Sequence, residues 1–310
     1  MGQNDIKNGA LYAGFSYLLW GILPIYWKLI HHVNSDEILA NRILWSFIFM
    51  IFILVFSRKW APLLQTLIGL KANKKQAAAL VIASVLISCN WFVYIWAVNA
   101  DRMIEASLGY YINPLVSVLL GMLVFKERLG IMQYISFILA LAGVLILSIS
   151  YGQVPWASLL LAFSFGFYGL AKKLITVEPA IGLTLETLVV APFALIYLII
   201  LYSNQSLALF HSSAGTDLLL LGAGIATAIP LLLFAKGAQK IPLSMLGFLQ
   251  YIAPTITLIL GVFVYGEAFS SVHLLAFLFI WSALTVYSLS KTKIYVHWQE
   301  KRKERKKIAL

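Results

Sequence analysis

Long apolar segments, separated by short polar connections, make up most of this chain of 310 residues. Each segment is about long enough to cross a bilayer as a helix, which takes about 20 mostly apolar residues. Only two connections are long: 58–76, which is rich in Lys and Arg, and 204–216, which has neither. The pattern predicts an all-α integral membrane protein with ten transmembrane helices, near residues 9–30, 38–57, 77–99, 104–125, 131–150, 154–172, 180–203, 217–236, 243–265 and 271–290.

The fourth and ninth segments are related in sequence. The string IEASLGYYINPLVSVLLGMLVFKE at 104–127 aligns without a gap with SMLGFLQYIAPTITLILGVFVYGE at 244–267, an offset of 140 positions. A weaker match at an offset of 145 relates the first and sixth segments. The matched residues include Tyr111 with Tyr251, Pro114 with Pro254, Glu127 with Glu267, Gly21 with Gly166, and Lys28 with Lys173.

These matches predict a chain of two related halves. The first five-helix repeat is expected in residues 1–150 and the second in 151–290, followed by a basic tail at 291–310. Because each half has an odd number of helices, the second half must cross the membrane in the opposite sense. Inverted repeats of this kind are common in secondary transporters.

Composition and charge agree with a membrane protein. The chain is 61% hydrophobic and 11% charged, whereas a soluble domain carries about 25% charged residues. With both termini in the cytoplasm, only Lys28, Arg42 and Arg102 of the 23 basic residues fall on the outside, as the positive-inside rule favours. The basic tail is therefore interpreted as a cytoplasmic anchor for anionic membrane lipid, and no nucleic-acid partner is expected.

Residues that would support a cofactor or an enzyme site are sparse. The chain has one cysteine, and its five histidines lack metal-ligand spacing. No phosphate-binding loop of the GxxxxGK[ST] type is present. Neither a metal, a cofactor nor an enzymatic activity is predicted.

Prolines inside two matched helices mark candidate gating positions. Pro114 and Pro254 each free a backbone carbonyl, which protein or cavity water must satisfy. Tyr110 and Gln250 lie one turn earlier and are predicted to line a substrate cavity.

The same two helices carry small residues four positions apart. Gly121 follows Ser117, and Gly261 follows Thr257. Small residues at this spacing let helices approach closely in lipid, so both glycines are expected at helix contacts.

The first and third helices supply three further candidates. Trp20 precedes Gly21 and Pro24, where the helix either bends as a gate or packs closely against a neighbour. Asn90 lies near mid-membrane, one turn from Tyr94. Trp20, Asn90 and Tyr94 are predicted to line the cavity, although Asn90 could instead bond to another helix.

Two charged residues fall inside predicted spans, where charges are costly and tend to be functional. Arg42 is expected near the outer face and Glu186 near the inner face, as two separate gating or coupling sites. Arg42 could instead extend to the membrane surface. Glu186 is the candidate for proton coupling, unless it bonds to Lys172 or Lys173 and is structural.

With these motifs in view, the chain resembles the RarD branch of the EamA family, in the drug/metabolite transporter superfamily. That resemblance implies ten helices in two inverted repeats around a central cavity. It also implies export or exchange of small metabolites or drugs. The strings that carry it are WGILPIYWK at 20–28, NRILWS at 41–46, NWFVYIWAVN at 90–99, EASLGYYINPLVSVLLG at 105–121, ETLVVAPFALIYL at 186–198, TAIPLLLFAKGAQ at 227–239 and LQYIAPTITLILG at 249–261.

The sequence therefore predicts a secondary transporter of the bacterial cytoplasmic membrane. It is expected to move a small organic molecule by alternating access. The alternative is a flippase of the same fold that moves a lipid or lipid-linked molecule. The sequence leaves the substrate, the coupling ion, the direction and the oligomeric state open.

Overall fold

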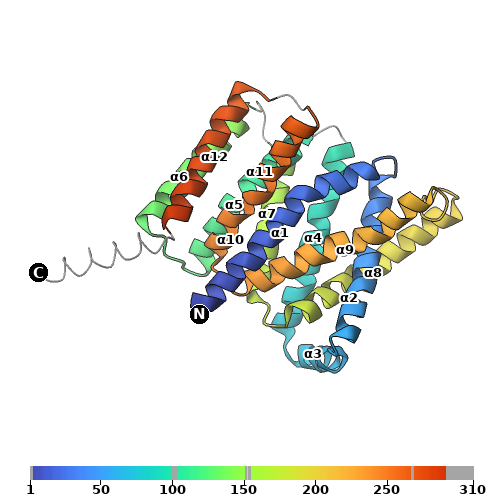
Figure 1. The fold of residues 1–310 in the computed structure, drawn as a ribbon. Coiled ribbons are helices and arrows are strands. Elements are labelled where there is room, and N and C mark those ends of the chain that lie inside the picture. Colours follow the sequence, from blue (N-terminus) through green and yellow to red (C-terminus); the bar gives the residue numbers. More distant parts are fainter. Residues whose placement is uncertain (1–2, 100–102, 151, 153–154, 267–268, 291–310) are drawn as a thin grey trace, which may run out of the picture.

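The computed structural model describes residues 3–99, 103–150, 152, 155–266 and 269–290, and this part of the chain contains helices and no strand (Figure 1). The helices are α1 (Gln3–Leu29), α2 (Ser35–Phe56), α3 (Trp60–Ala72), α4 (Lys74–Asn99), α5 (Met103–Val124), α6 (Ile131–Ser150), α7 (Trp156–Leu174), α8 (Pro179–Ser203), α9 (Ala214–Ala238), α10 (Leu243–Gln250), α11 (Ile252–Ile259), the π-helix η1 (Leu260–Val264) and α12 (Ser271–Ser290).

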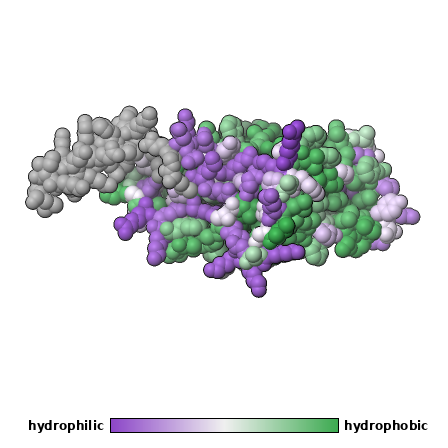
Figure 2. All heavy atoms as spheres, turned by 90° about the horizontal axis from the view of Figure 1, so that it is seen from below, coloured by the Kyte–Doolittle hydropathy of each residue, from purple (hydrophilic) through white to green (hydrophobic). Residues whose placement is uncertain are grey.

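Eight described segments are long and apolar enough to span a membrane, and Leu108–Val124 in α5 is a shorter apolar helix. The chain is therefore a multi-pass membrane protein. The predicted span at 154–172 corresponds to α7, which is not among the eight and ends with two lysines, Lys172 and Lys173. Figure 2 views the molecule from below Figure 1: hydrophilic residues gather across this side, and hydrophobic atoms flank them.

Two helix predictions need correction. The connection expected at 58–76 contains α3, because its basic ends enclose the apolar run 61–70. The single helix expected at 243–265 is divided into α10, α11 and η1. Pro254 has no N–H to donate to the carbonyl of Gln250, and the helix is interrupted at Tyr251, between these two residues.

The helices pack in a pattern that repeats between the two halves of the chain. The helix α1 packs against α9, α10 and α11, whereas α7 packs against α4 and α5. The helix α2 lies against α8 and α9. At one edge α6 and α12 lie side by side (Figure 1), and their buried Ala140, Val144, Ala276 and Ile280 share one apolar cluster.

Matched glycines make the same close contact in each half. A Cβ on Gly21 would lie 2.7 Å from Ile256 Cβ of α11, and one on Gly166 would lie 2.6 Å from Val116 Cγ1 of α5. Val116 and Ile256 are matched residues at the 140 offset. Each glycine therefore lets a helix approach the equivalent partner, α1 with α11 and α7 with α5.

Matched lysines also make the same contact. Lys28 Nζ lies 3.3 Å from the ring centroid of Tyr265, and Lys173 Nζ lies 5.4 Å from that of Phe125. Phe125 and Tyr265 are matched at the 140 offset. In each half the contact joins the C-terminal ends of two parallel helices.

The helix α5 runs antiparallel to α10. Gly121, near the end of α5, faces the amide of Ser244 at the start of α10, whereas Gly247 faces the carbonyl of Pro114. Lys173 contacts Phe125, just after the end of α5, whereas Lys28 contacts Tyr265, just after the end of η1. Because α5 and α10 are antiparallel, the two lysine–aromatic contacts lie at opposite ends of the bundle.

Candidate functional site

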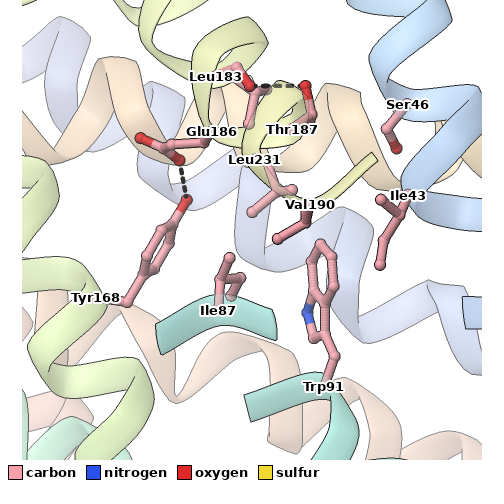
Figure 3. Close-up of a pocket in the computed structure, with 10 residues that line it drawn as sticks. All are labelled: Ile43, Ser46, Ile87, Trp91, Tyr168, Leu183, Glu186, Thr187, Val190 and Leu231. Atoms are coloured by element: carbon pink, nitrogen blue, oxygen red, sulfur yellow. Dashed lines mark hydrogen bonds between the residues drawn. The ribbon is translucent and has the colours of Figure 1, made fainter. Parts of the chain in front are cut away.

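A small pocket lies between α2, α4, α7, α8 and α9 (Figure 3). Its free volume is about 10 Å³, close to what a single water molecule needs. The lining is apolar except for a few polar groups. The lining residues are Ile43, Ser46, Ile87, Trp91, Tyr168, Leu183, Glu186, Thr187, Val190 and Leu231.

Glu186, in the wall of this pocket, is paired with a cation. Lys172 Nζ donates to Glu186 Oε1 at 2.7 Å, and both side chains are 2% exposed. The hydroxyl of Tyr168 donates to Glu186 Oε2 at 3.5 Å (Figure 3). Tyr168 and Lys172 lie one turn apart on α7, so a single helix face holds the carboxylate of α8.

Aromatic rings pack beside this ion pair. Phe234 stacks on Tyr168 at 5.7 Å between ring centroids. Trp20 contacts Phe234 at 5.6 Å and Phe165 at 5.8 Å. Trp20 therefore belongs to the packing around the Lys172–Glu186 pair and is not among the residues that line the pocket.

Arg42 points into the bundle from α2. Its Nε donates to Thr227 Oγ1 of α9 at 3.0 Å. Its Cζ lies 4.5 Å from the ring centroid of Trp27 and 4.9 Å from that of Trp91. Arg42 is half-buried, and its partners lie on α1, α4 and α9.

Close packing of α2 on α9 brings Arg42 to Thr227. A Cβ on Gly224 would overlap the backbone of Trp45, and Ser46 Oγ donates to the carbonyl of Gly224 at 3.0 Å. Arg42 lies one turn before Ser46 on α2, and Thr227 lies one turn after Gly224 on α9. The contact of Ser46 with Gly224 therefore places Arg42 beside Thr227.

Tyr94 and Tyr110 are next to this arginine. Their rings meet edge to face at 5.7 Å in the neighbourhood of Arg42. Tyr110 is 37% exposed, although it lies on a helix packed between α7 and α10. Two predicted cavity residues, Tyr94 and Tyr110, are thus brought together with one predicted gating residue, Arg42.

Trp91 connects the Arg42 cluster with the pocket. One ring contacts the guanidinium of Arg42 and also lines the pocket that Glu186 lines. The two charges that are predicted as separate sites thus have one neighbour in common, Trp91. We call Arg42, Lys172 and Glu186, together with Trp27, Trp91, Tyr94 and Tyr110, the polar tract.

Asn90 bonds to another helix. Its Nδ2 donates to the carbonyl of Leu161 and to Ser164 Oγ, each at 2.9 Å, and the side chain is buried. This geometry corresponds to the interhelical alternative given above. Gln250 is also buried, at the end of α10.

Two of the predicted gating prolines, Pro114 and Pro254, lie at the contact between α5 and α10–α11. The hydroxyl of Tyr111 donates to the carbonyl of Pro254 at 3.2 Å, and Pro114 is buried against Gly247. Gly261 is buried in η1, and Pro24 is half-buried within α1.

Gly121 makes room for a helix cap. A Cβ there would lie 2.8 Å from Glu127 Oε2. The carboxylate of Glu127 accepts from the amides of Leu243 and Ser244 at 2.7 and 2.9 Å, at the N-terminus of α10. Glu127 therefore caps the N-terminus of α10, and its match Glu267 lies outside the described residues.

Sequence reasoning did not single out Trp27, Trp91 or Thr227, nor did it give Lys172 more than an alternative role. Lys172 lies one turn after Tyr168 on α7, and this spacing could have indicated that both side chains face the same partner. Thr227, Trp27 and Trp91 stand in strings quoted above, but only the folded structure makes them neighbours of Arg42.

The family model of the EamA-like transporter family matches residues 7–149 and 154–289. The chain belongs to this family. Among curated EamA-like relatives, the uncharacterized transporter YojE of Bacillus subtilis is 52% identical over 293 residues, covering 94% of this chain and 97% of the relative.

Other relatives support the RarD branch. Protein RarD of Escherichia coli is 43% identical over 287 residues, covering 93% of this chain and 96% of that protein. The chloramphenicol-sensitive protein RarD of Pseudomonas aeruginosa is 29% identical over 276 residues, with coverage of 89% and 92%. The chain is therefore a membrane transporter of the RarD branch.

A solved structure described only as a crystal structure of a protein has the same fold. It superposes with a TM-score of 0.68 at 19% identity, covering 93% of this chain and 99% of that one.

Proposed function

We propose that this membrane transporter is a secondary transporter, which moves a small organic metabolite or drug across the cytoplasmic membrane by export or exchange. The polar tract is the central observation. An ion pair, an arginine and four aromatic side chains are held among apolar helices, where charges are costly and usually serve transport. The pocket beside them has room for about one water, so an organic substrate requires the helices to move.

Alternating access is proposed from the repeated contacts. Ten spans in two inverted five-helix repeats would relate residues 1–150 to 151–290, with the tail at 291–310 outside the repeats. The matched glycine contacts and the matched lysine–aromatic contacts support this relation, as does the antiparallel course of α5 and α10. Two equivalent bundles can then rock around the polar tract and expose it to each side in turn.

The proposed topology has both termini in the cytoplasm. The hydrophilic side of the molecule in Figure 2 supports it, together with the concentration of Lys and Arg in the connections assigned to the inside. The contact of Lys28 with Tyr265 would then lie at the outer mouth, and the contact of Lys173 with Phe125 at the inner mouth.

The bond between Glu186 and Lys172 is the structural alternative given above, and Glu186 is proposed as the coupling residue for a conformation in which this pair is open. Its carboxylate is held by Lys172, so movement that separates α7 from α8 would leave it free to take a proton. Proton-driven uptake into proteoliposomes should therefore lose its pH dependence in Glu186→Gln. Unchanged uptake with an unchanged pH profile would exclude coupling through this residue.

The substrate class is testable by ligand-dependent thermal stabilisation. A compound that binds only the folded state raises the unfolding temperature. The panel contains amino acids, aromatic metabolites, vitamins, chloramphenicol and polyprenyl phosphates, and each hit is then assayed for uptake into proteoliposomes. Transport of a soluble hit is expected, whereas stabilisation by polyprenyl phosphates alone would favour the flippase function.

A further inference from the structure

Arg42 has no carboxylate partner among the described residues. Within this part of the chain its one hydrogen bond goes from Nε to Thr227, and no ion pair includes it. A guanidinium has five N–H donors and stays charged under all ordinary conditions. Its terminal nitrogens therefore have donors available for an acceptor that the described residues do not supply.

Two described carboxylates in this region are already engaged. Glu37 lies five residues before Arg42 on α2, but its carboxylate accepts from the amides of Ala208 and Leu209 at 2.9–3.0 Å. Glu186, beyond Trp91, is held by Lys172. Arg42 is half-buried and its charge is unpaired among the described residues, so its position favours an anionic ligand.

The surroundings of Arg42 indicate what the rest of such a ligand is like. Trp27 and Trp91 present their faces to the guanidinium, while Tyr94 and Tyr110 form a second aromatic pair beside it. Aromatic walls with few polar groups bind an apolar or aromatic body. Tyr110 of this pair is 37% exposed.

We propose that Arg42 binds the carboxylate of the transported molecule, which is an organic monoanion with an aromatic or apolar body. Arg is suited to this role because its planar fork holds a carboxylate through two parallel hydrogen bonds. Thr227 orients the guanidinium through Nε and leaves the terminal nitrogens to the ligand. This inference rests on the proposed transport function and names the substrate class of the polar tract.

Matched pairs of compounds test the charge requirement. Binding to the purified protein in nanodiscs is measured by tryptophan fluorescence and thermal stabilisation, with phenylacetate, benzoate and indole-3-acetate against phenylacetamide, benzamide and indole-3-acetamide. We expect at least one acid to bind roughly 10- to 100-fold more tightly than its amide, as charge-assisted hydrogen bonds provide. Equal affinity of acid and amide, or no binding of any acid, would overturn the proposal.

Three variants test the residue. Arg42→Gln should remove the preference for the acid, and Arg42→Lys should retain part of it, because an ammonium attracts the carboxylate without the fork. Arg128→Gln, an exposed arginine in the connection before α6, is the matched control and should bind as the wild type does. If Arg42→Gln does not purify as a folded protein, Arg42→Lys decides. An acid preference as strong in Arg42→Lys as in the wild type would contradict binding through the guanidinium fork.

Uptake separates this inference from the transport function. If an acid binds through Arg42 but no gradient drives its uptake into proteoliposomes, the anion site stands and secondary transport fails. If uptake occurs only for uncharged compounds and is equal in Arg42→Gln, transport stands and the anion site fails.

Discussion

Lys172 Nζ lies 2.7 Å from Glu186 Oε1, and the two charged side chains are each only 2% exposed. They come from neighbouring helices, α7 and α8, and lie beside the pocket of the polar tract. Because neither charge reaches solvent in the described arrangement, each depends on the other.

Removing one member of this pair should destabilise the protein strongly. We expect Lys172→Met to lower the free energy of unfolding by about 3–5 kcal/mol, since it leaves a buried carboxylate without a partner. The double variant Lys172→Met with Glu186→Leu should recover most of the loss. Unfolding of the purified protein in detergent, evaluated as a double-mutant cycle, measures both effects.

The chain contains a matched control for this experiment. Lys59 and Glu178 form an ion pair of 2.8 Å, but their side chains are 39% and 38% exposed. Lys59→Met should therefore cost only about 0–1 kcal/mol. Equal losses at Lys59 and Lys172 would show that burial does not decide the strength of these pairs.

Asn90 should contribute to stability through its bond to α7. Replacing it with Ala removes the donor for Leu161 and Ser164, and interhelical hydrogen bonds in membranes contribute about 0.6–1.7 kcal/mol. Ser88→Ala is the control, because Ser88 bonds within α4 to the carbonyl of Ser84. A loss no greater than that of Ser88→Ala would mean that the bond between the helices adds nothing.

Two glycines of α1 should respond in opposite ways to alanine. Gly21→Ala places a methyl group 2.7 Å from Ile256 and should cost about 1–3 kcal/mol through overpacking. A Cβ on Gly14 would have no neighbour within 4 Å, so Gly14→Ala should be neutral or stabilise the helix by up to about 1 kcal/mol. Thermal unfolding of both variants measures the difference, and a stabilised Gly21→Ala would argue against close packing of α1 on α11.

Glu37 should hold the connection between α8 and α9 in place. Its carboxylate accepts from two amides of that connection, so Glu37→Gln weakens charge-assisted bonds to Ala208 and Leu209. We expect faster hydrogen exchange of these amides by roughly tenfold, measured by mass spectrometry on peptides covering 204–213. Exchange as slow as in the wild type would show that other contacts fix the connection.

Hydropathy alone predicted most of the helices. In lipid each span must satisfy its own backbone hydrogen bonds, so a long apolar run leaves little choice but a helix. The helix α3 was missed because its apolar run is short and lies among basic residues, and a short run does not distinguish a helix from a connection. Pro254 indicated a possible interruption of the helix in the ninth predicted span, and the helix is interrupted three residues earlier, at Tyr251.

The candidate site was predictable only in part. Hydropathy identifies Arg42 and Glu186 as unusual charges, but an estimate of their depth does not say which helices lie between them. Their connection through Trp91 depends on how α4 packs against α2 and α8. The same limit applies to Asn90, because its sequence context does not indicate that Ser164 faces it.

The two lysine–aromatic contacts are unequal, at 3.3 Å for Lys28 and 5.4 Å for Lys173. Different residues make the two contacts, so each contact can be changed alone. Exchanging a single ring, Tyr265 or Phe125, changes the relative strength of the two contacts without altering Arg42 or Glu186. If the two contacts hold the outer and inner ends as proposed, exchanging one ring shifts the balance between those ends while the residues of the polar tract stay the same.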